Sequence, residues 1–298
     1  MFVGAKAEHR GLVDRAIGHV YRSYVPADAP YYVTLDRIHQ HVRPRGYLEV
    51  GVYRGLALAL ALPGTRAVGI DPDPHVAFPL TRRARVVQDS SDDAFAVRDL
   101  WRLLGRKPLD LAFIDGRHLF EFALRDFMNI ERLAHPGTVV LLHDCLPHDE
   151  RSASRARETQ LWSGDVWKLI PTLRKWRPEL QVHVIDVAPA GLGIISGLVP
   201  GNRVLERHYD EIVRNAADIH YQLLVDEGPV KVLNSVPGDW GTVKGLLPER
   251  PFRQVPITVL TAWRAAWAWL VHLAGRRAER GASGIGATIF RRAYNGST

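Results

Sequence analysis

Residues Asp110–His118, with the sequence DLAFIDGRH, and residues Val139–Cys145, with the sequence VVLLHDC, decide the fold of this chain. Each stretch is a short apolar run that ends in acidic and imidazole side chains. This pattern is typical of a buried parallel strand that carries polar groups to its carboxyl end. Between the two runs, residues 119–133 repeat apolar side chains at helical spacing. We therefore predict a strand, a helix and a second strand. Such a crossover makes the two strands parallel and brings their carboxyl ends to the same edge of the sheet.

Four polar residues are expected to meet at that edge, which is where open α/β sheets bind their ligands. They are Asp115, His118, His143 and Asp144. A catalytic or ligand-contacting role is favoured for His118, because it shares the edge with Asp115.

Charge and cysteine content restrict the class of protein. Residues 253–298 hold seven arginines against one acidic residue and so carry +6 of the total charge of +7. The rest of the chain is nearly neutral, whereas a nucleic-acid-binding protein would carry a basic face on the fold itself. We therefore expect no nucleic acid partner. Cys145 is the one cysteine, which suits a reducing cytoplasm. The first residues contain no apolar run, so we expect no signal peptide.

Strand and helix patterns alternate along the rest of the chain. Further strands are predicted at 46–51, 66–71, 85–89, 180–187 and 191–196, and helices at 5–23, 35–42, 56–62, 93–104 and 165–176. The fold class is therefore α/β, a doubly wound, Rossmann-like fold with a seven-stranded, mostly parallel sheet. We divide the chain into N-terminal helices (1–44), a central domain (45–200) and a helical C-terminal extension with a basic tail (201–298).

The C-terminal extension has less regular patterns. Residues 204–224 are predicted as one long helix and residues 228–251, rich in Gly and Pro, as a loop. An apolar helix with several tryptophans follows at 257–274; Arg264 and His272 interrupt it, and it is short for a membrane span. We expect it to lie in a core or in a homodimer interface. The alternative is peripheral membrane contact through residues 257–292, with Trp in the headgroup layer and Arg near anionic lipid.

The turn after the first predicted strand indicates the kind of ligand. Gly51 and Gly55 would let a ligand approach bare backbone. Their spacing is not Gly-x-Gly-x-x-Gly, which argues against NAD or FAD, and there is no Gly-Lys-Ser/Thr of an ATP-binding P-loop. Asp71 ends the second strand, where a carboxylate can bind ribose hydroxyls. Together these features favour an adenosyl-type nucleoside without a long pyrophosphate.

Over roughly residues 40–200 these motifs resemble class I S-adenosylmethionine-dependent methyltransferases. The glycine-rich, acidic and adenine-flanking motifs correspond to Glu49–Gly55, Gly69–Asp71 and Gln88–Ser90. Phe113–His118, Pro136–Gly137 and Leu142–Asp144 are similar to a bacterial methyltransferase family with the pattern IDGxH, LxPGG and HD. Thr138 departs from the third position of PGG. Relatives of this family include metal-dependent O-methyltransferases that act on macrolide sugars and on catechols.

The resemblance implies a cofactor site and a metal site. The implied S-adenosylmethionine-binding residues are Glu49, Gly51, Tyr53, Gly55, Asp71, Asp89, Ser90 and Asp115. Asp115 and Asp144 match metal ligands, and His118 matches the catalytic base. His143 is the third candidate ligand, although it stands where sugar-methylating relatives have an acid, so it could instead orient Asp144. Cys145 stands where the catechol enzyme has Asn.

Elementary chemistry supports the same roles. An alcohol is too weak an acid at neutral pH to attack a sulfonium methyl group. A divalent cation that binds the hydroxyl lowers its pKa, and an imidazole can accept the proton. The carboxylates of Asp115 and Asp144 suit Mg²⁺ or Mn²⁺, whereas His143 as a ligand would shift the preference toward Mn²⁺, Fe²⁺ or Zn²⁺. Trp162 and Trp167 are candidates for stacking on the acceptor, with plain packing as the alternative.

The sequence therefore predicts a cytoplasmic, homodimeric, metal-assisted O-methyltransferase of a small-molecule hydroxyl, preferably on a saccharide. Its catalytic residues would be His118 and Asp115, and its cofactors S-adenosylmethionine and Mg²⁺ or Mn²⁺. Two alternatives use the same residues. One is a metal-dependent hydrolase that activates water, and the other is a non-catalytic nucleoside-binding interaction protein.

Overall fold

The computed structural model describes residues 30–78 and 80–249, which form an eight-stranded sheet with helices on both faces. The strands are β1 (Gly46–Val50), β2 (Arg66–Ile70), β3 (Ala84–Val87), β4 (Leu109–Ile114), β5 (Val139–His143), β6 (Gln181–Asp186), β7 (Leu192–Ser196) and β8 (Ser235–Pro237). Their order is β3-β2-β1-β4-β5-β7-β6-β8. Only β7 is antiparallel to its neighbours, β5 and β6. The predicted mostly parallel sheet is confirmed, and the short β8 adds an eighth strand beside β6.

The central strands show why the sequence forms this sheet. Every residue of β1, β4 and β5 is buried. Burial on both faces explains why these segments are nearly continuous apolar runs and not alternating ones. The strand order reverses between β1 and β4, because β2 lies on one side of β1 and β4 on the other. A crevice outside the carboxyl ends at such a reversal is the usual ligand site of doubly wound folds.

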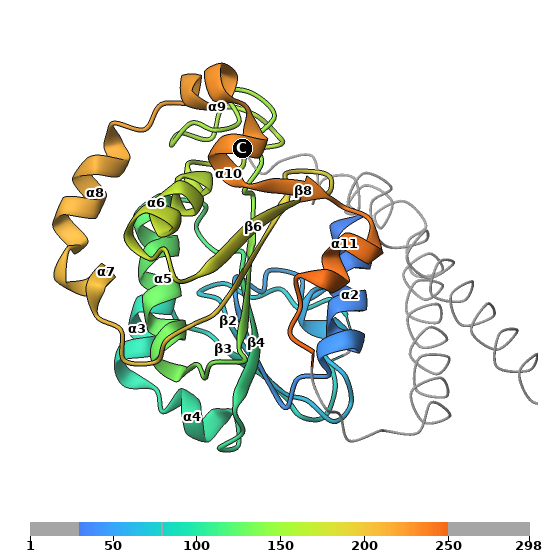
Figure 1. Ribbon diagram of the computed structural model, residues 1–298. Helices are drawn as coiled ribbons and strands as arrows, with labels where there is room; N and C mark the ends of the chain where they lie inside the picture. The colour runs from blue at the N-terminus through green and yellow to red at the C-terminus, as the bar shows by residue number, and fades with distance from the viewer. Residues whose placement is uncertain (1–29, 79, 250–298) are drawn as a thin grey trace, which may run out of the picture. The chain divides into compact units, whose positions relative to one another are not determined.

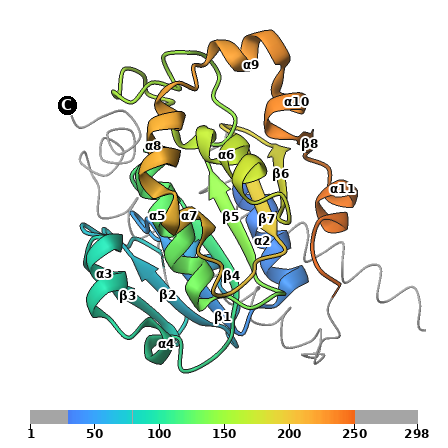
Figure 2. The ribbon, with the colours of Figure 1, turned by 60° about the vertical axis from the view of Figure 1, so that its left-hand side comes forward.

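Helices cover both faces of the sheet (Figure 1). The helices are α2 (Tyr31–Val42), α3 (Ser91–Val97), α4 (Leu100–Leu103), α5 (Phe120–Leu133), α6 (Leu169–Trp176), α7 (Val204–Arg207), α8 (Tyr209–Ala217), α9 (Gln222–Glu227), α10 (Pro229–Leu233) and α11 (Trp240–Gly245), with short 3₁₀ helices η1 (Leu58–Leu60) and η2 (Val166–Lys168). Helices α3, α5 and α6 lie on one face, and α2 and α11 on the other. Helix α8 packs over α5 (Figure 2).

Two helix predictions near the sheet need correction. The segment 56–62 forms only η1 and turns, because it is buried along its whole length and has no polar side to face solvent. It is also shorter than the length at which helix propensity alone suffices. The single helix predicted at 93–104 is divided into α3 and α4. The Asp99 carboxylate accepts the Arg102 N–H and so begins a new helix.

The predictions for residues 204–251 were also wrong in detail. The expected long helix at 204–224 is three short helices, α7, α8 and α9. The expected loop at 228–251 contains α10, β8 and α11. Its Gly and Pro residues mark the ends of short elements: Gly228 has φ +79° and Pro229 occupies the first turn of α10, a position that suits proline.

Several predictions fall on residues outside the described ranges. They concern the helix at 5–23, the apolar helix at 257–274 and the basic tail, and with them the homodimer and membrane interfaces. Residues Tyr31–Glu249 form one compact unit. Among the residues that the structure describes, no helix is both long and apolar enough to cross a bilayer.

Candidate active site

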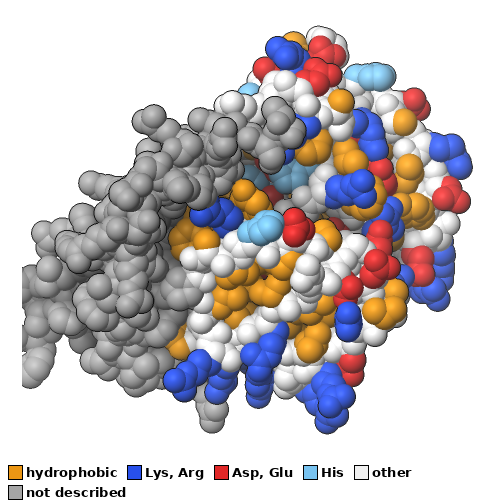
Figure 3. Space-filling view, turned by 180° about the vertical axis from the view of Figure 1, so that it is seen from behind, with side chains coloured by type: hydrophobic (Ala, Val, Ile, Leu, Met, Phe, Trp, Pro, Cys, Tyr) orange, Lys and Arg blue, Asp and Glu red, His pale blue; other side chains and the backbone are white. Residues whose placement is uncertain are grey.

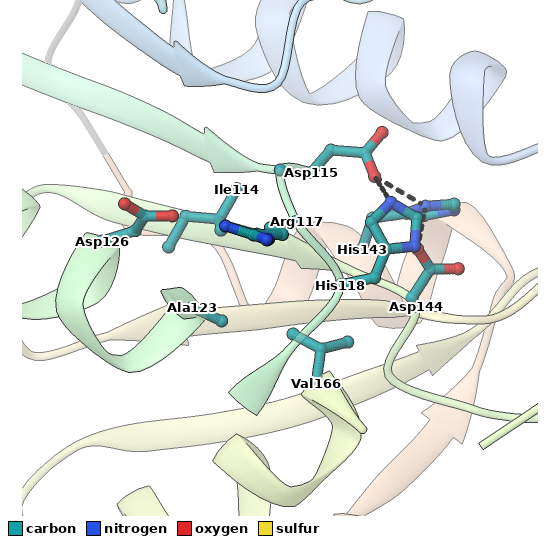
Figure 4. A pocket seen from close by; sticks show the side chains of 10 residues that line it. Ile114, Asp115, Arg117, His118, Ala123, Asp126, His143, Asp144 and Val166 are labelled. Carbon is teal, nitrogen blue, oxygen red and sulfur yellow. Dashed lines mark hydrogen bonds and ion pairs between the residues drawn. The ribbon is translucent and has the colours of Figure 1, made fainter. Parts of the chain in front are cut away.

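The parallel pairing of β4 and β5 brings the predicted polar residues together. Ile114 lies opposite Leu142, so Asp115 and His143 are the next pair along the two strands. His118 follows in the turn that leads to α5, and Asp144 comes directly after β5. All four side chains gather on one side of the close-up view (Figure 4). In the space-filling view from behind, histidine and acidic side chains are visible in a hollow of the surface (Figure 3).

Two carboxylates and two imidazoles form a compact cluster. Nδ1 of His143 lies 3.2 Å from Oδ1 of Asp115 and 3.3 Å from Oδ2 of Asp144. Nδ1 of His118 lies 2.9 Å from the same Asp144 oxygen, and its Nε2 lies 3.6 Å from Oδ1 of Asp115. One ligand atom each from Asp115, His118 and Asp144 lie within 4.8 Å of one another, a separation that a single metal ion can bridge.

The electrostatics of this cluster favour cations. Burial alone would lower the pKa of both imidazoles, but the adjacent carboxylates outweigh it and raise the pKa of His118 to about 9 and that of His143 to about 10. Burial would raise the pKa of Asp144, yet the two imidazoles hold it well below its ordinary range. Without a metal, each carboxylate charge is therefore balanced by an imidazolium. A divalent cation would compete with those protons.

The surroundings of His118 define which of its nitrogens is reactive. Nδ1 faces the Asp144 carboxylate and, at 3.3 Å, the carbonyl oxygen of Trp162. Both groups only accept hydrogen bonds, so Nδ1 carries a hydrogen. In the neutral ring the lone pair is then on Nε2, which is the nitrogen that can accept a proton or bind a metal.

His143 is held by aromatic packing. The ring of Tyr31, at the start of α2, stacks on it with centroids 4.1 Å apart, and Phe113 meets it edge-on at 6.4 Å. Its Nε2 is buried and has no hydrogen-bond partner among the described residues. Sequence reasoning missed Tyr31, because an aromatic residue at a helix start has no signal that distinguishes it from core packing.

The cluster borders a small cavity of about 10 Å³, roughly the space of one water molecule. Asp126 of α5 lines the same cavity at the side away from the imidazoles (Figure 4). Its Oδ1 has no partner within the described part of the chain, and burial raises its pKa to about 7. No pattern in the sequence distinguished this acid from other helical acids.

The predicted cofactor residues follow the carboxyl ends of four neighbouring strands. Glu49 lies in the last part of β1 and Gly51 directly follows that strand; Asp71 directly follows β2, Asp89 and Ser90 come shortly after β3, and Asp115 directly follows β4. Gly51 has φ +88°, and a Cβ there would lie 1.9 Å from the carbonyl oxygen of Asp115. The first glycine therefore allows β1 and β4 to end side by side.

Asp71 organises the glycine turn. Its Oδ2 accepts the N–H groups of Val52 and Tyr53 at 2.8 and 2.7 Å, and its Oδ1 accepts that of Asp73 at 2.8 Å. A carboxylate has about four acceptor positions, so one remains on Oδ1 for a ribose hydroxyl. The exposed Tyr53 and the nearby Gly55, with φ +79°, lie in the same turn.

The other predicted cofactor residues have structural partners. Asp89 forms an ion pair with Arg98, and Ser90 caps α3 by accepting the Asp93 N–H at 3.1 Å.

Glu49 is fully buried and accepts the Tyr47 hydroxyl at 2.6 Å. Burial, together with nearby Asp115 and Asp71, raises the pKa of Glu49 well above its usual value. Its second oxygen lacks a partner among the residues described.

The two tryptophans differ in role. Trp167 is buried in the core, which is the packing alternative. Trp162 instead lies against His118, with ring centroids 5.4 Å apart and an interplanar angle of 8°.

Comparison with known proteins gives one family match. The sequence profile of a methyltransferase domain matches residues 48–145, which run from β1 to the residue after Asp144 and include the whole cluster. No curated protein matches this chain. The match agrees with the resemblance seen in the motifs.

Among solved structures, the chain is similar to an O-methyltransferase from Bacillus cereus in complex with SAH, with 16% identity and a TM-score of 0.43 over 62% of this chain and 90% of that one. It is also similar to the O-methyltransferase TomG from Streptomyces achromogenes, involved in tomaymycin synthesis and in complex with SAM, with 15% identity and a TM-score of 0.44 over 63% and 89% of the two chains.

Proposed function

We propose, from the match of residues 48–145 to the profile of a methyltransferase domain, that this protein is an S-adenosylmethionine-dependent O-methyltransferase of a small-molecule hydroxyl. The observation that carries the proposal is the cluster of two carboxylates and two imidazoles beside the glycine turn. It combines groups that hold a cation with a group that accepts a proton, at the edge of the sheet where the nucleoside would bind.

The cofactor would lie across the carboxyl ends of β2, β1 and β4. The free acceptor position on Asp71 suits one ribose hydroxyl. The raised pKa of Glu49 favours its protonated form, so its second oxygen would donate a hydrogen bond to the ligand. Asp89 and Ser90 keep their structural partners in this arrangement, so we propose that they shape the wall of the site. Both are exposed enough to contact a ligand from that wall.

The donor set fits a divalent cation. The two carboxylates of Asp115 and Asp144 suit Mg²⁺ or Mn²⁺. His143 would be the third ligand, since its Nδ1 lies close to both acids, and its imidazole would favour Mn²⁺ over Mg²⁺. A bound divalent cation supplies Lewis acidity that lowers the pKa of an acceptor hydroxyl.

His118 would act as the general base. Its Nδ1 is held by Asp144 and by the Trp162 carbonyl, so Nε2 can accept a proton. The two carboxylates are the cause of its raised pKa. When their charge is balanced by a cation instead of by protons, the neutral imidazole is favoured, which is the form that a base needs.

We further propose a saccharide as the acceptor, as the sequence resemblance implies, and a cytoplasmic location. A polar acceptor suits a site whose charged groups are two acids and two imidazoles. The assay therefore starts with methyl α-mannopyranoside and with catechol as probe acceptors, since sugar and catechol hydroxyls are the two classes that the resemblance suggests.

The test is isothermal titration with S-adenosylmethionine, with and without Mg²⁺ or Mn²⁺, followed by methyl transfer to the two probes. His118→Ala is expected to lower kcat by about 10²–10⁴-fold with unchanged cofactor affinity. His143→Ala is expected to weaken metal binding instead. His208→Ala, at an exposed ion pair with Glu211 far along the chain, is the control.

Three outcomes would contradict parts of this proposal. Failure to bind S-adenosylmethionine under every metal condition would refute the methyltransferase, and metal-dependent hydrolysis would then favour the hydrolase. Loss of metal affinity in His118→Ala, with normal affinity in His143→Ala, would exchange the roles of the two histidines. Full turnover after chelation would remove the metal from the reaction.

A further inference from the structure

His118 has a backbone conformation that needs external support. Its φ is +53°, in the left-handed region that residues other than glycine seldom adopt. Such a conformation is unfavourable for a residue with a Cβ and persists only where neighbouring structure enforces it. The turn between β4 and α5 therefore does not by itself determine where the imidazole lies.

The segment 152–165 supplies that support. Gly164, with φ +64°, approaches so closely that a Cβ would lie 1.8 Å from the His118 carbonyl oxygen. The N–H groups of Ser163 and Gly164 both donate to the Ser152 carbonyl at 3.0 Å. Asp165 accepts the N–H of Phe120, the first residue of α5, at 2.9 Å. The segment is thus closed by its own backbone bonds, lies against the backbone of His118 and is bound to the first residue of α5.

An ion pair fastens the segment from outside. The Arg155 guanidinium binds Glu121 of α5 at 2.6 Å and Asp165 at 2.8 Å. This contact joins the beginning and the end of the segment to the first turn of α5.

Trp162 is the part of this segment that touches the imidazole. The indole and imidazole planes are nearly parallel, at 8°, with centroids 5.4 Å apart. The Trp162 carbonyl lies 3.3 Å from Nδ1 of His118, and the indole Nε1 donates to the Ser154 carbonyl at 2.7 Å. The indole is therefore held at its own far end, and it limits rotation of the His118 ring through one face and one nitrogen.

We propose that Trp162 is a positioning residue for His118: it sets the plane of the imidazole and directs Nε2 toward the reaction centre. The inference rests on the proposed function only for its effect on turnover. The stacking and the hydrogen bond at Nδ1 concern the protein without any ligand.

Three variants test the proposal. Trp162→Leu removes the aromatic face, Trp162→Phe retains it, and Trp101→Leu is the matched control at a half-exposed indole in α4. The first readout is the Hε1 proton NMR signal of His118, assigned by its loss in His118→Gln. The second is methyl transfer to methyl α-mannopyranoside or catechol. Thermal unfolding establishes that each variant is folded.

Trp162→Leu is expected to move the His118 signal downfield, because the ring current of the indole is lost, and Trp162→Phe to move it less. Trp162→Leu is also expected to lower kcat by about 10–100-fold, the scale of a misplaced catalytic group, with KM and cofactor affinity unchanged and with substantial rescue in Trp162→Phe. Trp101→Leu should change neither readout.

The two arms separate the inference from the proposed function. An unmoved His118 signal in folded Trp162→Leu would overturn the inference, and so would a moved signal with unchanged kcat. If the wild-type protein transfers no methyl group, the proposed function fails, and the NMR signal alone then decides whether Trp162 positions the ring.

Discussion

The buried His39 in α2 should contribute a loss of stability in mild acid. Its side chain is 1% exposed and meets Tyr47 edge-on, with ring centroids 4.5 Å apart. Nδ1 has no hydrogen-bond partner in the described part of the chain. Burial lowers the pKa of His39 to about 3, whereas in the unfolded chain it titrates near 6.5.

The sign of the effect follows from proton uptake. Between pH 6.5 and 3 the unfolded chain binds a proton at His39 and the folded protein does not, so the free energy of unfolding falls as the pH falls. A shift of one pKa unit corresponds to 1.36 kcal/mol, so this residue alone costs about 2 kcal/mol at pH 5 relative to pH 8. That is a large part of a total stability of about 5–15 kcal/mol.

The measurement is urea unfolding of the wild type and of His39→Phe at pH 8 and pH 5. Phenylalanine retains the aromatic contact with Tyr47 and does not titrate. The wild type should lose about 2 kcal/mol more than the variant between the two pH values. Comparing the change in the free energy of unfolding between pH 8 and pH 5, the pH slope, removes any packing difference that does not depend on pH. His208→Phe, at an exposed site, should keep the wild-type slope. Equal slopes in wild type and His39→Phe would refute the reasoning.

Three further predictions concern stability. Arg177→Met should destabilise the protein by about 3–5 kcal/mol in urea unfolding, because the buried Glu131 carboxylate loses the two nitrogens that bind it at 2.7 and 2.8 Å. Adding Glu131→Gln should restore part of this stability, and a double variant as unstable as Arg177→Met would contradict this account. Asp126→Asn should raise the melting temperature at pH 8 but not at pH 4. Burial raises the pKa of Asp126 to about 7, so the wild-type protein loses stability as the pH rises from about 3.8 to 7, and asparagine does not. An equal gain in melting temperature at both pH values would disprove this explanation. Gly51→Ala should destabilise the fold and weaken S-adenosylmethionine binding, because the added Cβ would clash with the Asp115 carbonyl oxygen. Normal binding at wild-type stability would show that β1 and β4 can move apart.

Much of the sheet was predictable because its strands are buried on both faces. A short, continuous apolar run such as Val139–His143 indicates a buried strand, and the predicted ends of this strand agree closely with those in the structure. Helices that depend on tertiary packing were harder. The segment Leu56–Leu62 is a strong helix former by composition, yet only its centre forms a 3₁₀ helix, because burial on all sides removes the amphipathic signal.

The cluster at the carboxyl edge could also be predicted from the sequence, since topology alone brings Asp115, His143 and Asp144 to one place. The hydrogen-bond partners of Asp71 could not be predicted. Asp71 accepts three backbone N–H groups, although it matches a cofactor motif by residue type and position. A motif specifies which groups are present, whereas the bonds that they make depend on backbone turns that have no periodic pattern.

Backbone strain explains why the active histidine depends on a distant segment. His118 and Asp144 both have positive φ, at +53° and +60°, so the two residues joined by the 2.9 Å contact each lie in a turn that the local sequence does not favour. The energy that holds these turns must come from packing contributed elsewhere, and for His118 it comes from residues 152–165. Since Gly164 touches its backbone and Trp162 its ring, a change in that segment should alter the base without altering the residues that define the motif.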